Sequence, residues 1–256
     1  MKINEIITLA LTTFNRIDFT KQTIENIYDT TKSNFNLIII DNGSTDNTVE
    51  YLNSLKYSNL KLVLSNENHG IAIARNIGVY LSDKLNTDWY VCLDNDILLP
   101  DNAIEKCIDI LKNNKDFSMI GVNYENKQYP MVNINGFKFQ EKPHPGNLGS
   151  ATIVFNKQIR KMFGFFNTNY SKFYGLEDTT FSLRQRAMGF RLGYILENGI
   201  HLGENEDSNS DYRKMKTYEH NLYLNKYQED VKKYFETKQV FVSWLPSEKI
   251  KRLLGE

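Results

Sequence analysis

The sequence predicts an α/β fold with a mostly parallel, Rossmann-like central sheet flanked by helices, followed by a C-terminal helical appendage. Two observations support this. Up to about residue 200, short apolar runs alternate with amphipathic stretches. Polar side chains also stand directly after several of the apolar runs. Right-handed crossovers bring such strand ends to one edge of a sheet, where ligands of these folds bind.

In the first half of the chain, the strongest strand is the run 37–40, which ends on Asp41, and the first helix is predicted to start with Asp18 as its N-cap. The predicted elements are, in order, a strand at 5–11, a polar loop at 12–16, the helix that follows it, the strand at 37–40, a helix starting within 44–47, a strand at 60–64, a helix at 70–81 and a strand at 89–93.

After about residue 100 the pattern loosens. We predict a helix at 103–113, a strand at 119–122, a loop or small hairpin within 123–148, a strand at 151–155, a helix at 177–188 and a last strand at 191–196. From residue 208 onward, aromatic and aliphatic residues recur at helical spacing. The predicted organisation is therefore one α/β domain over residues 1–207 and a helical appendage over 208–256.

The composition excludes several classes of protein. Lys and Arg together number 31, as do Asp and Glu, so the chain lacks the basic field of a nucleic-acid binder. Cys92 and Cys107 are expected to be buried thiols and are too few for a zinc framework. No apolar run approaches about 18 residues and no signal peptide is visible, so we expect a cytoplasmic protein that does not span a membrane.

Asp94 and Asp96 follow the apolar strand at 89–93. Residues two apart in an extended segment point the same way, so both carboxylates can face one site. Hard oxygen ligands suit Mg²⁺ or Mn²⁺ bridged to a diphosphate. The alternative is an ordinary acidic turn before the next helix.

Asp41 and Arg75 are the other two charged candidates in this half. Asp41 ends a buried strand and can accept a hydrogen bond from an imide N–H such as that of uracil, or it can hold an Asx turn with its neighbours. Arg75 lies within a helix whose small residues allow close packing on the sheet. It can reach a phosphate or a carboxylate, or form a surface ion pair of little energetic worth.

The order and spacing of four stretches (12–16, 41–46, 68–76 and 94–96) resemble the inverting glycosyltransferases of family 2, which have the GT-A fold and use nucleotide-sugars. The resemblance covers about residues 5–205. It implies that the nucleotide is held by Thr13 and its segment, Asp41 on the uracil, Asn68 and Arg75. It also implies that Asp96 ligates the metal while Asp94 contacts ribose or metal-bound water. Asn95 stands where the family often has another acid or a small residue, and we include it in the donor-binding set.

Two later motifs extend the resemblance. The segment 175–184 contains Glu177 and Asp178, which on their own would simply favour a helix N-terminus. The resemblance implies that Asp178 is the catalytic base and that Glu177 orients the acceptor. It also implies that His201 completes the metal site, and a nitrogen ligand shifts the preference from Mg²⁺ toward Mn²⁺. Gly149 is expected beside the donor sugar, since a small residue allows close backbone approach.

These inferences predict a metal-dependent hexosyltransferase that moves a sugar from a UDP-sugar to a glycan, lipid-linked or protein acceptor, in bacterial surface or cell-wall glycan synthesis. A nucleotidyltransferase would be expected to carry a glycine-rich loop after its first strand, and 12–16 has no glycine. A non-catalytic nucleotide-sugar-binding or scaffold protein would be expected to lack Asp178 or the pair Asp94 and Asp96. The segment 213–256 has more Lys and Arg than Asp and Glu and contains Phe241, Trp244 and Leu245. It is expected to pack on the core, and the alternatives are peripheral contact with the inner face of a membrane or an oligomer formed through the C-terminal helices.

Overall fold

The structure, a computed structural model, describes residues 5–125, 127–144, 146–149, 151–169, 175–203, 211–237 and 248–255. Within these ranges, a central sheet contains the strands β1 (Ile7–Thr13), β2 (Phe35–Asp41), β3 (Leu60–Leu64), β4 (Trp89–Asp94), β6 (Phe117–Asn123), β7 (Met131–Ile134), β8 (Phe137–Lys142), β9 (Thr152–Asn156) and β10 (Arg191–Asn198). A separate two-stranded ribbon pairs β5 (Ile97–Leu98) with β11 (Ile200–His201).

The strands of the central sheet follow the order β3-β2-β1-β4-β9-β6-β10-β8-β7. β1 to β4 run parallel to one another, which reflects their buried, continuously apolar sequences. β9 is antiparallel to both neighbours, β4 and β6, and β10 is parallel to β6. The prediction of an α/β sheet is therefore confirmed in its parallel half, and antiparallel strands extend the other half.

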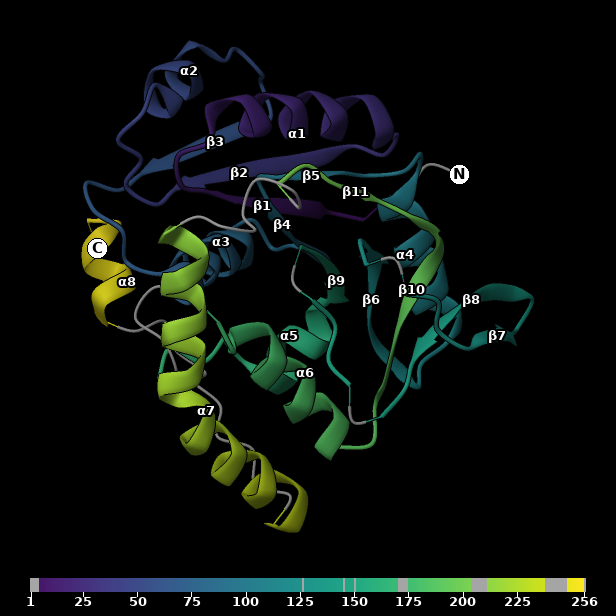
Figure 1. Ribbon diagram of the computed structural model, residues 1–256. Helices are drawn as coiled ribbons and strands as arrows, with labels where there is room; N and C mark the ends of the chain where they lie inside the picture. The colour runs from purple at the N-terminus through teal and green to yellow at the C-terminus, as the bar shows by residue number, and fades with distance from the viewer. Residues whose placement is uncertain are drawn as a thin grey trace.

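Helices cover both faces of the sheet (Figure 1). One face is packed by α1 (Ile17–Thr30), α2 (Thr48–Ser54) and α4 (Ala103–Asn113), whose buried aliphatic residues join those of β1 and β4 in one core cluster. The other face is packed by α3 (Ile71–Lys84), α5 (Lys157–Phe163) and α6 (Glu177–Ala187). The predicted bounds of α4 match the structure because its apolar positions recur with clear helical spacing.

Small residues let α3 lie close to the sheet, as its sequence predicts. A Cβ placed on Gly78 would lie only 2.6 Å from the Cβ of Ala10 in β1, so that position has no room for a side chain. Ala74 is fully buried one turn earlier. The close packing fixes the direction in which the polar residues at the start of α3 point.

The predicted N-cap of the first helix is wrong. α1 begins at Ile17, and Asp18 lies in its first turn instead. The cap residue is Arg16, in the left-handed region with φ 62°, and its side chain makes no capping hydrogen bond. The backbone N–H of Ile17 is instead satisfied by Asp46 Oδ2 at 3.3 Å, from the loop before α2. The predicted loop also begins later, because Thr12 and Thr13 belong to β1.

The region 123–148 contains the predicted hairpin, formed by β7 and β8. Asn135 and Gly136 form its turn, both with positive φ, which matches the right-handed twist of the flanking strands. Cys92 and Cys107 are buried free thiols, as predicted.

The described part of the C-terminal region contains α7 (Asp211–Thr237) and α8 (Glu248–Leu253). α7 contacts α6 and α8 contacts α3, so both lie on the same side of the molecule (Figure 1). Ile250 of α8 is buried in the cluster that contains Ala10 and Ile77. The tail residues Phe241, Trp244 and Leu245, and with them the predicted membrane or dimer contact, lie outside the described residues.

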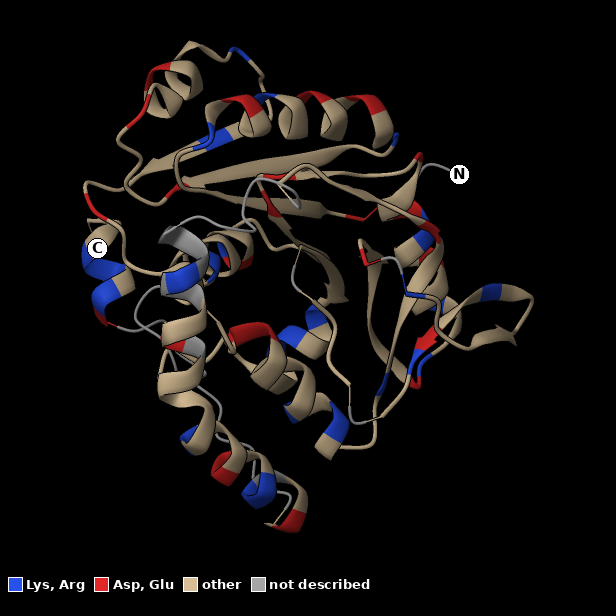
Figure 2. Cartoon of the chain, viewed as in Figure 1, with Lys and Arg blue, Asp and Glu red and all other residues tan. Residues whose placement is uncertain are grey.

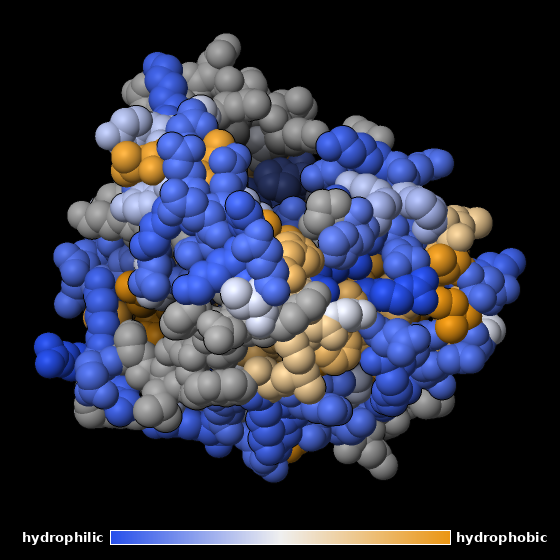
Figure 3. Space-filling model, turned by 90° about the horizontal axis from the view of Figure 1, so that it is seen from below, coloured by the Kyte–Doolittle hydropathy of each residue, from blue (hydrophilic) through white to orange (hydrophobic). Residues whose placement is uncertain are grey.

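The surface carries charges of both signs. Lys and Arg alternate with Asp and Glu along α7 (Figure 2). The face seen from below is mostly hydrophilic, with hydrophobic groups in separate places (Figure 3). Among the described helices, none is both long and apolar enough to cross a bilayer.

Candidate functional site

The carboxyl ends of β2, β1 and β4 lie side by side and form the floor of the site. Thr13 is in register with Asp41, and Thr12 is in register with Asp94. The polar residues that follow these strands in sequence are therefore brought to one edge of the sheet, as the β-α-β topology requires.

Asp94 and its neighbourhood are organised by Arg75. The guanidinium Nη2 of Arg75 donates to Asp94 Oδ1 at 2.6 Å, and Nη1 lies 3.2 Å from Glu177 Oε1. Arg75 is only 3% exposed, which excludes a surface ion pair. Burial opposes its charge, but Asp94, Glu177 and Asp178 outweigh that effect and raise the pKa of Arg75. The arginine therefore remains a cation that joins the end of β4 to the start of α6.

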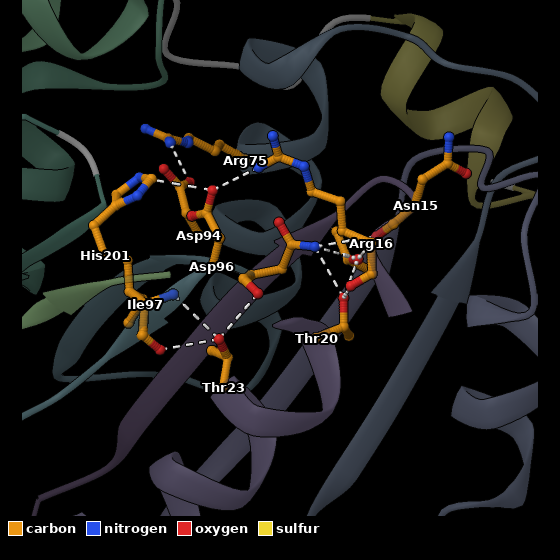
Figure 4. Close-up of polar contacts among 11 residues, drawn as sticks. Asn15, Arg16, Thr20, Thr23, Arg75, Asp94, Asp96, Ile97 and His201 are labelled. Carbon is orange, nitrogen blue, oxygen red and sulfur yellow. Dashed lines mark hydrogen bonds and ion pairs between the residues drawn. The ribbon is translucent and has the colours of Figure 1, made fainter. Parts of the chain in front are cut away.

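Asp96 lies beside His201 and Arg16. Asp96 Oδ2 accepts from Arg16 Nη1 at 2.8 Å and lies 3.6 Å from His201 Nε2 (Figure 4). The ribbon of β5 and β11 produces this arrangement, because it pairs His201 with Ile97. The backbone N–H of Leu202 also donates to the Asp96 carbonyl at 2.8 Å. His201 thus lies beside Asp94 and Asp96, which precede it by about a hundred residues in the sequence.

Asn95 points away from the two acids. Its Nδ2 donates to Thr13 Oγ1 at 3.0 Å, to Thr20 Oγ1 at 2.9 Å and to the Asn15 carbonyl at 3.2 Å. Thr13 Oγ1 also lies 3.0 Å from Thr20 Oγ1. The side chains of Thr13 and Asn95 therefore fasten the β4 turn to the start of α1.

Asp41 is fully buried and holds a turn. Its Oδ1 accepts from the backbone N–H groups of Gly43, at 3.2 Å, and Ser44, at 2.9 Å, and its Oδ2 accepts from the Ser44 hydroxyl at 2.5 Å. A Cβ on Gly43 would lie 2.4 Å from the backbone of Glu67, and its φ is +84°, so this position requires glycine. The Asx turn weighed from the sequence is present in the structure.

Asn68 links this turn to α3. Its Oδ1 accepts from Asn42 Nδ2 at 3.0 Å and from the Gly70 N–H at 2.8 Å, while Asn42 Oδ1 accepts from the His69 N–H at 3.0 Å. These bonds fix the loop that leads into the helix carrying Arg75.

Glu177 and Asp178 begin α6, on the opposite side of Arg75 from Asp94. Glu177 is 4% exposed, whereas Asp178 is half-buried and accepts from the Thr179 N–H at 2.5 Å. Burial raises the pKa of Glu177, and the neighbouring Asp178 raises it further while Arg75 lowers it, with a net pKa of about 7. One buried carboxyl group of the site thus exchanges its proton near neutral pH.

The loop 146–149 lies against α6. The Leu148 N–H donates to Ser182 Oγ at 3.2 Å, and Asn147 Nδ2 donates to Thr179 Oγ1 at 3.0 Å. Gly149 is exposed, and a Cβ built on it meets no atom within 4 Å. The next residue, Ser150, lies outside the described residues.

Sequence reasoning missed the roles of Arg16, Gly203 and Tyr227. A Cβ on Gly203 would lie 3.2 Å from Arg16 Nη1 and 3.4 Å from Asp96 Oδ2, so this glycine closes the site around the ion pair. Tyr227, on α7, is half-buried, and its pKa is raised to about 12 by burial and by the Asp178 carboxylate. The glycine after His201 was a visible signal, but nothing local indicates what α7 contacts.

The described residues include no group of three or more His, Cys, Asp or Glu side chains arranged to hold a metal ion. Asp96 and His201 offer two ligand atoms. His201 Nδ1 is buried and, among the described residues, has no hydrogen-bond partner. Four carboxyl groups, those of Asp94, Asp96, Glu177 and Asp178, surround the two arginines of the site, so its charge balance suits an added cation.

Comparison with known proteins identifies glycosyltransferases as relatives. The sequence model of the family "Glycosyl transferase family 2" matches residues 8–172. An uncharacterized glycosyltransferase of Haemophilus influenzae is 31% identical over 111 residues, which cover 43% of this chain and 43% of that protein. A poly-β-1,6-N-acetyl-D-glucosamine synthase of Staphylococcus aureus is 29% identical over 120 residues, 46% of this chain and 28% of that protein. The chain thus spans less than half the length of these two relatives.

A solved structure shares the architecture. The crystal structure of GalNAc-T7 with UDP, GalNAc and Mn²⁺ superposes with a TM-score of 0.60 at 12% identity, over 77% of this chain and 44% of that one. At this identity the likeness concerns the fold alone, and it confirms the predicted GT-A architecture.

Proposed function

The chain belongs to glycosyl transferase family 2, and we propose that it transfers a sugar from a UDP-sugar to an acceptor hydroxyl with inversion at the anomeric carbon. One observation carries the proposal. The buried guanidinium of Arg75 contacts Asp94 at the end of β4 and Glu177 at the start of α6. The candidate donor side and the candidate acceptor side therefore face each other across one side chain.

The nucleotide is proposed to lie over the carboxyl ends of β1 and β2. The turn held by Asp41 and the loop held by Asn68 form the two walls of the proposed nucleotide site, and Asp94 would contact the ribose. Thr13 and Asn95 act beneath them by fixing the β4 turn. UDP in GalNAc-T7 supports a uridine nucleotide. The role of Asp41 on the uracil stays a proposal, since its known hydrogen bonds are to its own turn.

A divalent cation is proposed to bind Asp96 and His201, with Asp94 reached through water. The residues fit such an ion because Asp96 Oδ2 and His201 Nε2 are 3.6 Å apart. Two ligands about 2.1 Å from one ion are about 3 Å apart at a right angle and about 4 Å apart when opposite each other. When bound, Mn²⁺ or Mg²⁺ would supply positive charge to the departing diphosphate. The presence of Mn²⁺ in GalNAc-T7 supports this choice.

Asp178 is proposed as the base. Its carboxylate takes the proton of the acceptor hydroxyl while the acceptor oxygen forms the new bond to the anomeric carbon. The bond from that carbon to the diphosphate oxygen breaks, and its electron pair leaves with the UDP. Such general-base assistance contributes about 10²–10⁴ in rate. Arg75 positions Asp94 and Glu177, and its positive charge lies between these two carboxyl groups.

The acceptor side is proposed to include Glu177 and Tyr227, while the exposed backbone at Gly149, where a Cβ would meet no atom within 4 Å, is proposed to lie beside the donor sugar. An aromatic ring beside a carboxylate offers a sugar both an apolar face and a hydrogen-bonding partner. The name of the staphylococcal relative supports an acceptor that is a growing surface glycan.

The proposal is tested by incubating the protein with Mn²⁺ and a panel of UDP- and GDP-sugars, and measuring release of the free nucleotide with and without candidate acceptors. We expect slow release from one UDP-sugar, its loss in EDTA and its return with Mn²⁺. Binding of a UDP-sugar with no turnover under any condition would identify a non-catalytic binding protein. Release of pyrophosphate in place of UDP would identify a nucleotidyltransferase.

A further inference from the structure

One oxygen of Asp96 is shared by two candidate partners. Asp96 Oδ2 accepts from Arg16 Nη1 at 2.8 Å, and the same oxygen lies 3.6 Å from His201 Nε2. The Arg16 side chain is 24% exposed and that of Asp96 is 11% exposed. The His201 side chain is 29% exposed, so both partners of the buried carboxylate are partly accessible to solvent.

The position taken by Arg16 conflicts with a cation at Asp96. A metal ion on Asp96 Oδ2 would use the oxygen that Arg16 now uses, and it would meet a like charge at short range. Gly203 leaves little space beside these atoms, since a Cβ there would lie 3.2 Å from Arg16 Nη1 and 3.5 Å from His201 Cε1. A guanidinium and a metal ion at the same oxygen repel each other, so each weakens the binding of the other.

Arg75 does not share this conflict. It is 3% exposed and held by carboxylates at both ends, Asp94 and Glu177. Asn15 and Arg16 both have positive φ, of 57° and 62°, and the Arg16 side chain extends from the start of α1 to Asp96 (Figure 4). Of these two arginine side chains, that of Arg16 is the more exposed, at 24% against 3% for Arg75.

We propose that Arg16 is a built-in counter-cation of Asp96 that a divalent metal displaces, and that the displaced guanidinium then pairs with the diphosphate of the donor. This inference rests on the proposed function. Guanidinium groups bind phosphate oxygens in a two-pronged geometry, so the lost ion pair is replaced when the nucleotide is present. Metal and donor therefore strengthen each other's binding, and by thermodynamic linkage the effect is equal in both directions.

The test is the affinity for Mn²⁺, measured from the electron paramagnetic resonance signal of the free ion, in the presence and absence of UDP. For the wild-type protein, we expect UDP to tighten Mn²⁺ binding at least about tenfold. Arg16→Ala removes the competing cation, so it should bind Mn²⁺ about tenfold more tightly than the wild type when UDP is absent. UDP should then tighten Mn²⁺ binding much less in this variant than in the wild type.

Arg191→Ala is the matched control, because Arg191 also pairs with a carboxylate, Glu141, but on β10 and β8. It should leave Mn²⁺ affinity unchanged. Unchanged or weaker Mn²⁺ binding by Arg16→Ala without UDP overturns the inference while leaving the proposed metal site intact. If Asp96→Ala binds Mn²⁺ as well as the wild type does, the proposed metal site fails, and the inference fails with it.

Discussion

The ionisation of Glu177 links the charge of the site to the stability of the fold. Its pKa rises from an ordinary 4.5 to about 7, chiefly because it is buried and secondly because Asp178 is adjacent. A carboxyl group with a raised pKa in the folded state contributes stability that is fully present below 4.5 and is lost as the pH rises through about 7. Arg75 limits this loss because it favours the ionised form.

Glu177→Gln should remove this pH dependence. Relative to the wild type, the variant should gain about 2–3 kcal/mol in free energy of unfolding between pH 5 and pH 8. Urea denaturation at the two pH values measures it. Glu141→Gln is the control, since Arg191 lowers the pKa of Glu141 below 4.5, so its titration lies at more acid pH and this substitution should give almost the same difference from wild type at pH 5 and pH 8. If the free energies of unfolding of Glu177→Gln and wild type differ by the same amount at both pH values, the pKa of Glu177 is not raised in the folded state.

Asp41 allows two roles to be separated by substitution. Asp41→Ala should raise the donor KM and reduce the preference for UDP over other nucleotides, since a buried partner left unpaired costs about 1–3 kcal/mol. Ser44→Ala removes the hydroxyl that donates to Asp41 Oδ2 and keeps the carboxylate. Competition binding with UDP, GDP and CDP distinguishes the roles. If both variants lose stability while nucleotide preference stays the same, Asp41 only holds the turn.

The sequence allowed prediction of some site residues because their position depends on strand ends. Asp41 and Asp94 each end a buried strand, and parallel topology then brings them together. Arg16 could not be found in this way. Its contact with Asp96 depends on the left-handed turn at Asn15 and Arg16 and on the course of a long side chain, neither of which leaves a periodic signal.

At the scale of elements, α7 brings a C-terminal residue to a site built by the preceding domain. Tyr227 senses the charge of Asp178, and Phe235 near the end of α7 packs edge-on against His144 with ring centroids 5.3 Å apart. The helix is thereby attached both to α6 and to the segment before Gly149. Its position is suited to forming one wall for the acceptor.

Tyr227→Ala should raise the acceptor KM about tenfold, because the loss of one aromatic contact costs about 1.4 kcal/mol, while donor affinity stays the same. Tyr218→Ala is the matched control, since Tyr218 lies on the same helix and is 68% exposed. Steady-state kinetics with varied acceptor, together with calorimetry of UDP binding, measure the two effects. An equal effect of both substitutions would show that α7 acts only through its general stability.

Element prediction succeeded where a period was long and clear, as for α4, and failed where tertiary contacts decide. α5 has only seven residues, too few for a helical repeat to stand out. The ribbon of β5 and β11 has two residues in each strand and exists because it pairs across the fold. That ribbon nevertheless determines where His201 lies.

At the scale of the whole molecule, the boundary proposed at residue 207 separates sequence patterns and not independent cores. Ile250 of α8 is 1% exposed and shares a cluster with Ala10 of β1 and Ile77 of α3. The C-terminal segment therefore covers a face of α3 that would otherwise meet water. This contact could not be foreseen, because nothing in a short amphipathic helix indicates which surface it covers.

Ile250→Ala should lower the free energy of unfolding by about 2–4 kcal/mol, since it leaves a cavity in that cluster. Leu222, on α7, is 58% exposed, so Leu222→Ala should change the free energy of unfolding by less than about 0.5 kcal/mol. Chemical denaturation measures both. An effect at Ile250 no larger than that at Leu222 would mean that α8 contributes little to the fold.

The central claim is that Asp178 removes the proton of the acceptor, and Asp178→Asn tests it most directly. The amide keeps the shape of the side chain and its ability to accept from the Thr179 N–H, but it cannot take a proton. The measurement is paired: UDP-sugar affinity by calorimetry with Mn²⁺, and kcat for transfer to a working acceptor. We expect affinity within about twofold of the wild type and kcat lower by about 10² or more. Unchanged kcat would show that another group is the base, and loss of binding together with activity would show that Asp178 is structural.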